Sequence, residues 1–153
     1  MYNLIVFLPL IGSILAWIFG NKFKSKLSFL CTISCMILAM FISWVGFFDI
    51  TINKNEFEGF VYPWFASGNL VVNWNLKFDT LSLVMMMVVT TVSTMVHIYS
   101  IGYMSHDDSK SRFMAYLSFF TFAMLILVSS SNLLQLFVGW EGVGVASYLL
   151  IGF

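Results

Sequence analysis

The sequence predicts an all-α membrane protein with five transmembrane helices and a short external β-hairpin-like segment between the second and third helices. Hydrophobic residues make up 60% of the 153 residues and charged residues only 9%, and the mean hydropathy is +0.94. A soluble domain has roughly 45–50% apolar and about 25% charged residues, so a single integral membrane domain over residues 1–153 is predicted. The formal net charge is zero, and no basic patch supports nucleic-acid binding.

The predicted spans cover about residues 4–19, 27–48, 81–103, 113–128 and 133–153. Each is an apolar run close to the length of about 20 residues that a helix needs to cross a bilayer. The first run contains Pro9, which a membrane helix tolerates as a mild kink. Its basic residues follow the run instead of preceding it, so a retained helix is expected and not a cleaved signal peptide.

Residues 49–79 interrupt the apolar pattern and carry most of the acidic side chains. Residues 72–78 alternate between apolar and polar with a period of two, which is typical of a half-buried strand. Residues 57–65 are the expected second arm of a surface hairpin. Tyr62, Trp64 and Trp74 suit the headgroup level of a bilayer.

The distribution of lysine and arginine predicts the orientation in the membrane. Five basic residues lie in the first and third connections: Lys22, Lys24, Lys26, Lys110 and Arg112. The second connection has Lys54 and Lys77 among four acidic residues, and the fourth connection has no basic residue. The N-terminus is therefore predicted outside and the C-terminus inside.

Glu141 is the strongest candidate for a functional residue, because it is the one carboxylate within the last apolar run. A charged group at the centre of a bilayer is costly, and such residues usually face a protein interior or a water path. Burial would raise the pKa of this carboxyl unless a cation lies close, and a group balanced in this way can act as a proton relay. The alternative is a structural carboxylate bonded to a neighbouring helix.

His97 is the second candidate for proton transfer, because it lies on a stripe of hydroxyl side chains along the third span. The stripe consists of Thr90, Ser93, Thr94 and Ser100 and is expected to face protein or water. A histidine bonded to a hydroxyl or a backbone carbonyl is the preferred alternative. His106 lies in a polar loop, and Arg112 and Lys110 are expected to be topology determinants and headgroup anchors.

The sequence gives no indication of a metal or redox cofactor site. Cys31 and Cys35 share a helix face but have no further ligands nearby, so small packing residues are expected there. The methionines at 85, 86 and 87 cannot present three sulfurs on one helix face. No motif for NADH, flavin or an iron–sulfur cluster is present, so a redox enzyme that acts alone is not expected.

The last span carries the most specific pattern in the chain, NLLQLFVGWEGVGVASYLLIGF. It closely resembles the fifth span of the chain-5 (L-type) antiporter-like subunit of respiratory complex I, the proton-pumping NADH:quinone oxidoreductase. The segments FDTLSLVMMMVV, HIYSIGYM and SRFMAYLSFFTFAMLILV resemble the third and fourth spans of that subunit, and LIVFLPLIGS resembles its start. Subunits of cation/proton antiporters are similar too, but Gly142, Val143 and Gly144 favour complex I.

The resemblance implies a membrane subunit that takes part in proton translocation, with other complex I subunits and the lipid bilayer as partners. It implies that Glu141 matches the essential glutamate of the fifth span, which pairs with a lysine on a later helix in the family. The resemblance also implies a chain that is truncated relative to the family, either a fragment, a split-gene product or a vestigial remnant. A bacterial plasma membrane and a mitochondrial inner membrane both fit.

Overall fold

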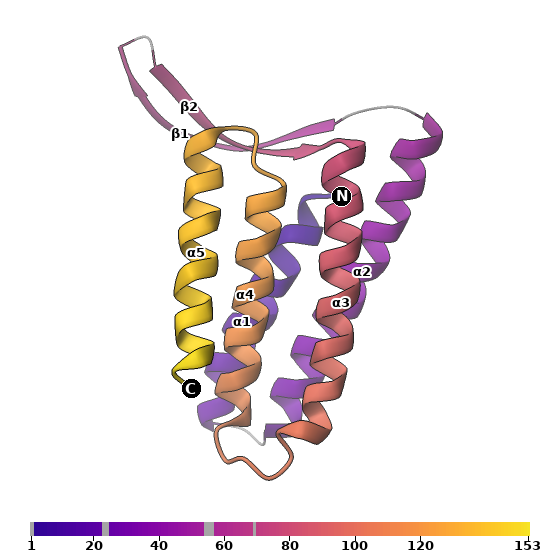
Figure 1. Cartoon of the computed structure of the whole chain (residues 1–153), viewed down its shortest axis with the longest axis vertical. Helices are drawn as coiled ribbons and strands as arrows, with labels where there is room; N and C mark the ends of the chain where they lie inside the picture. Colours follow the sequence, from indigo (N-terminus) through magenta and orange to yellow (C-terminus); the bar gives the residue numbers. More distant parts are fainter. Residues whose placement is uncertain (1, 23–24, 54–56, 69) are drawn as a thin grey trace.

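The computed structural model describes residues 2–22, 25–53, 57–68 and 70–153. In this part of the chain, five helices stand side by side and a two-stranded hairpin lies across one end of them (Figure 1). The elements are α1 (Asn3–Lys22), α2 (Ser25–Asn53), β1 (Phe57–Ser67), β2 (Leu70–Phe78), α3 (Thr80–Tyr103), α4 (Lys110–Val128) and α5 (Leu133–Ile151). The predicted all-α fold with five helices and a hairpin is confirmed.

Four stretches are long and apolar enough to cross a membrane: Ser28–Ile52, Thr80–Tyr103, Lys110–Val128 and Leu133–Ile151. They correspond to the second to fifth predicted spans, and the protein is a multi-pass membrane protein. In α1 the apolar stretch is shorter, Asn3–Ile18. A membrane crossing by α1 therefore stays a prediction.

The largest difference from the predicted boundaries lies at the end of α2. We expected the helix to end at residue 48, before Asp49, but it continues to Asn53. The Asp49 side chain is exposed at the end of the bundle that carries the hairpin, where its carboxylate accepts a hydrogen bond from the Tyr2 hydroxyl. An acid placed there does not have to enter an apolar environment, so it does not end the helix.

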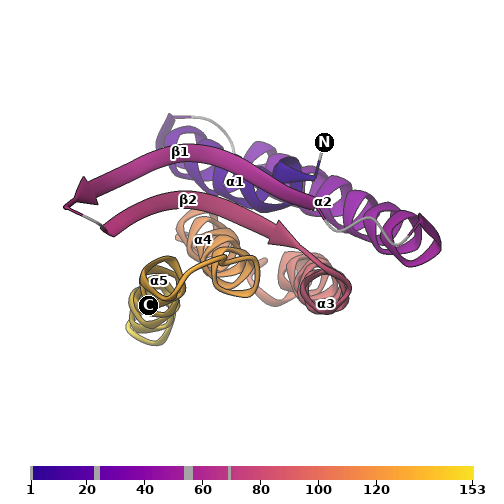
Figure 2. The same ribbon diagram turned by 90° about the horizontal axis from the view of Figure 1, so that it is seen from above.

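The hairpin follows the predicted alternation and is longer than predicted. The two strands pair antiparallel from Phe57 opposite Phe78 to Ser67 opposite Leu70, and Gly68 has a φ of 58° at the turn. The register is irregular on either side of Pro63, which has no N–H to donate to the partner strand. Figure 2 shows that the hairpin runs over the ends of the helices and extends past α5.

The base of the hairpin is part of the main hydrophobic core. Leu76 and Phe78 are fully buried in a cluster with residues of α1, α3 and α4. The backbone N–H of Lys77 donates to the Ser129 carbonyl over 2.8 Å, and the Asn132 side chain donates to the Asn73 carbonyl over 2.9 Å. These contacts fix the connection between α4 and α5, and thus the start of α5, against the hairpin.

Asp79 is the N-cap of α3, where its carboxylate accepts a hydrogen bond from the backbone N–H of Ser82 over 2.7 Å. Burial alone would raise its pKa, but the hydrogen bonds from Ser82 and the Lys77 ammonium at 3.1 Å outweigh burial, so the pKa lies below the ordinary 3.8. A carboxyl with a lowered folded-state pKa stabilises the fold above its unfolded pKa and loses this effect as the pH falls through the folded pKa.

We expect Asp79→Ala to lower the free energy of unfolding by about 1 kcal/mol at neutral pH, because the cap is lost. Asp79→Asn keeps an oxygen that can cap the helix but removes the charge. The stability of this variant should therefore lack the loss that protonation of the Asp79 carboxylate causes in the wild-type chain at acidic pH. Thermal unfolding of the detergent-solubilised chain at neutral and acidic pH measures both effects. Equal destabilisation by the two variants at every pH would contradict the capping role.

Candidate functional site

The helix that carries Glu141 begins with a side-chain cap. Asn132 accepts a hydrogen bond from the backbone N–H of Gln135 over 2.8 Å, and α5 starts at the next residue, Leu133. Asn132 is therefore the N-cap of α5. Because its side-chain amide also donates to the Asn73 carbonyl, it links the start of α5 to the hairpin.

One face of α5 packs closely on α4 because its residues are small. A Cβ atom on Gly139 would lie 2.8 Å from the backbone N and Cα of Leu127, closer than real Cβ atoms approach. On Gly142 it would lie 3.2 Å from the Cβ of Ala123, and Ala146 is fully buried one turn further along. Two of the glycines beside Glu141 therefore serve close helix packing.

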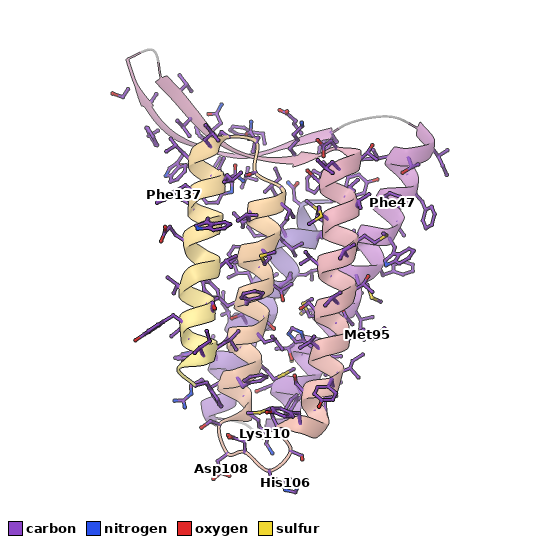
Figure 3. All side chains as sticks on the ribbon, in the orientation of Figure 1. Phe47, Met95, His106, Asp108, Lys110 and Phe137 are labelled. Atoms are coloured by element: carbon purple, nitrogen blue, oxygen red, sulfur yellow. The ribbon has the colours of Figure 1, made fainter. Side chains whose placement is uncertain are left out.

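The Glu141 side chain lies on the other side of α5 and is exposed. Its neighbours on this face are exposed too, including Phe137 at 58% and Tyr148 at 78%, and Figure 3 labels Phe137 on the same helix. The carboxylate of Glu141 therefore faces away from the other described helices. The physical reason is that the small face of α5 can approach α4 more closely than the face with the carboxylate and the large apolar side chains.

The environment of Glu141 is unusual for a surface carboxylate. It lies near the middle of a 19-residue apolar helix, and no hydrogen bond or ion pair joins it to another side chain in the described part of the chain. A Cβ at Gly144, one turn away on the same face, would meet nothing within 4 Å. A carboxylate at this depth in a membrane requires cover by protein or water, because hydrocarbon solvates the charge poorly.

His97 is fully buried between α3 and α4. Its Nδ1 lies 2.7 Å from the Ser93 carbonyl oxygen and its Nε2 lies 2.9 Å from the Ser118 hydroxyl. Because a carbonyl can only accept, Nδ1 of the neutral ring carries the hydrogen and Nε2 accepts from Ser118. The contacts fit the preferred alternative of a histidine bonded to a hydroxyl and a carbonyl.

The hydroxyl stripe of α3 faces protein, as predicted. The Thr90 hydroxyl lies 2.8 Å from that of Ser43 on α2, and the Thr94 hydroxyl donates to the Met36 carbonyl over 3.3 Å. On the other side, the Ser93 hydroxyl lies 2.6 Å from that of Thr121 on α4. The stripe therefore joins α3 to both neighbouring helices.

The structure does not bring the two candidate proton carriers together. α4 lies between α3 and α5 (Figure 2), His97 contacts the α3 side of α4, and Glu141 points away from α4. Any proton transfer between the two would require groups other than the described contacts. Their roles in proton relay stay predictions.

Sequence reasoning overlooked Gln135. It is fully buried in the first half of α5, and both polar atoms of its amide are without a hydrogen-bond partner in the described part of the chain. The signal was present in the sequence, because Gln135 is an uncharged polar residue within an apolar span.

The remaining candidates behave as solvent-exposed or packing residues. His106 is exposed in the loop before α4, where Figure 3 labels it beside Asp108 and Lys110. The Arg112 guanidinium lies 5.4 Å above the ring of Phe153. Cys31 and Cys35 are free thiols, each half-buried. Among the described residues, no three His, Cys, Asp or Glu side chains gather as a metal site would require.

Comparison with known proteins shows what this chain is similar to. Residues 64–114 match the family described as NADH-Ubiquinone oxidoreductase (complex I), chain 5 N-terminus. NADH-ubiquinone oxidoreductase chain 5 of Arabidopsis thaliana is 48% identical over 153 residues, which is 100% of this chain and 23% of that protein. NADH-quinone oxidoreductase subunit L of Rickettsia typhi is 47% identical over 150 residues, 98% of this chain and 23% of that protein.

Over its whole length, the chain matches the N-terminal part of the chain-5 (L-type) subunit of complex I. The resemblance inferred from the sequence is thereby confirmed, and the chain spans about a quarter of the length of these relatives. The segment matched by the chain-5 family comprises most of the hairpin, all of α3 with His97, and the start of α4 with Arg112. Glu141 lies beyond this segment and within the region that the full-length comparisons cover.

Proposed function

We propose that this chain supplies the N-terminal helices of a chain-5-type membrane subunit of NADH:quinone oxidoreductase and takes part in proton translocation. The proposal rests on the similarity of the entire chain to proteins named NADH-ubiquinone oxidoreductase chain 5 and NADH-quinone oxidoreductase subunit L. The fold supports it, because Glu141 lies near the middle of an apolar helix that is long enough to cross a membrane. Electron transfer, with NADH, flavin, iron–sulfur clusters and quinone, would take place in partner subunits.

In this proposal, Glu141 takes up and releases a proton. The carboxylate points outward from the described helices and has no ionic partner among them, so we expect its cover to be protein or water outside these helices. A basic group in that cover would favour the charged carboxylate, and its movement or neutralisation would favour the protonated form. This difference between two states is what a relay needs.

The proposal includes an orientation. The end of the bundle opposite the hairpin has Lys110 and Arg112 on α4, and α1 ends there with Lys22 (Figure 1). Basic residues collect on the inner side of membranes, so we place this end inside and the hairpin outside. The membrane is either a bacterial plasma membrane or a mitochondrial inner membrane.

Purification of the chain from its native membrane in a mild detergent tests the assignment to the complex. We expect it to migrate in a large assembly that oxidises NADH, together with redox subunits identified by mass spectrometry. Recovery of the chain alone, or with an assembly that exchanges cations for protons and oxidises no NADH, would contradict the proposal. The latter result would assign the chain to an antiporter.

A further inference from the structure

Three neighbouring hollows lie on the outer surface of α1, α4 and α5, toward the end of the bundle opposite the hairpin, and each shares lining residues with the other two. We call them together the α1–α4–α5 groove. The central hollow has a volume of about 250 Å³ and is lined mainly by apolar side chains. The other two have volumes of about 260 and 270 Å³, and Arg112 lines both of them.

The central part of the groove presents flat and branched apolar surfaces. It is formed by Ile14, Trp17 and Ile18 of α1, Tyr116 and Phe119 of α4, and Leu149 of α5. The Trp17 and Tyr116 rings lie 6.0 Å apart between their centroids, and 52% of the Trp17 side chain is exposed. A surface of this kind in a membrane span suits a hydrocarbon chain.

The charged part of the groove is provided by Arg112. Its guanidinium is exposed and lies 5.4 Å above the Phe153 ring, and no ion pair involves it in the described part of the chain. The hydroxyl-bearing residues Tyr116 and Tyr148 line the same hollow. Asp108 lines only the neighbouring hollow of about 270 Å³, so an anion is better placed on the side of Tyr148.

Lys110, the other described basic residue at the start of α4, does not contribute to the groove. The Lys110 ammonium donates a hydrogen bond to the Ser105 carbonyl over 3.3 Å and lines none of the three hollows. Figure 3 shows Lys110 and Asp108 in the region of the loop that precedes α4. Arg112 is thus the positive group at which the polar and apolar parts of the groove meet.

We propose that the α1–α4–α5 groove binds one anionic phospholipid, with a phosphate oxygen at Arg112 and an acyl chain along Trp17, Tyr116 and Leu149. The groove matches such a ligand in two respects: its apolar part runs along the membrane span, and its cation lies at the headgroup end of that span. An arginine fork binds phosphate in a bidentate manner. A zwitterionic headgroup also carries a phosphate, but its own cationic group lowers the net attraction to arginine. The proposal does not depend on proton translocation.

Fluorescence of Trp17 tests this directly. The whole chain is placed in phosphatidylcholine vesicles that contain either brominated phosphatidylglycerol or brominated phosphatidylcholine, and bromine quenches a tryptophan that it contacts. The difference between the wild-type chain and Trp17→Phe isolates the signal of Trp17 from the other four tryptophans. A basic residue near the membrane surface gives about a fivefold preference for anionic lipid. Half of the Trp17 fluorescence should therefore be quenched by about fivefold less brominated phosphatidylglycerol than brominated phosphatidylcholine.

Arg112→Gln should bring the two quenching curves together, while Lys110→Gln should leave their separation unchanged. Circular dichroism of each variant in the same vesicles establishes that the helices are retained. The proposal is overturned if the wild-type curves coincide, or if Lys110→Gln removes the preference as fully as Arg112→Gln. It is equally overturned if neither lipid quenches Trp17, because another protein segment then covers the groove.

Discussion

Glu141→Gln is expected to lower the number of protons translocated per NADH oxidised severalfold, without loss of the assembled complex. Glutamine has nearly the same shape as glutamate but cannot exchange a proton, so only a relay role is removed. The substitution should leave the fold of the chain unchanged, because Glu141 is exposed and has no hydrogen bond or ion pair with another described side chain. Acidification of sealed membrane vesicles on addition of NADH, recorded together with NADH oxidation, gives this ratio.

Two variants make the measurement specific. Gly144→Ala adds a methyl group to the same outward face of α5 and meets no atom of the described chain within 4 Å, so its effect on pumping measures how closely the cover of Glu141 packs on this face. Glu141→Asp keeps the carboxyl but shortens the side chain by one methylene, and we expect partial activity. An unchanged proton-to-electron ratio in Glu141→Gln would remove the relay role. The same assay on His97→Gln tests the second candidate, and a normal ratio there would leave His97 with a structural role alone.

Gly139→Ala is expected to destabilise the bundle by about 1–3 kcal/mol relative to Gly144→Ala, which is the range for overpacking a close contact. The added methyl group would lie 2.8 Å from the backbone N and Cα of Leu127, and backbone atoms within a helix cannot move aside cheaply. Replacement of glycine by alanine within a helix is otherwise favourable by about 1 kcal/mol. The comparison with Gly144 cancels this general gain, because both residues lie within α5.

Thermal unfolding of the two variants in detergent, followed by the loss of helical circular dichroism, measures the difference. We also expect Gly139→Ala to accumulate less in membranes, since α5 can no longer approach α4 as closely. If Gly139→Ala is as stable as Gly144→Ala, the close approach of the two helices contributes little to the fold. The packing of α5 would then depend on its cap and on the hairpin instead.

Much of the fold could be read from local patterns. Long apolar runs locate the four helices α2 to α5, because a polar backbone in hydrocarbon must satisfy its own hydrogen bonds. The period-two alternation of residues 72–78 located one arm of the hairpin, since neighbouring side chains of a strand point to opposite faces. The end of α2 could not be predicted in this way, because the Asp49 carboxylate accepts a hydrogen bond from Tyr2, which lies far from it in the sequence.

The candidate site shows the same division. Composition and a carboxylate in an apolar run are local properties, so the sequence was enough to predict a membrane protein that resembles the chain-5 subunits and to single out Glu141. The direction in which Glu141 points depends on how α5 packs in the tertiary structure. The small residues at 139, 142 and 146 let α5 approach α4 closely, and this packing turns the carboxylate away from the other described helices.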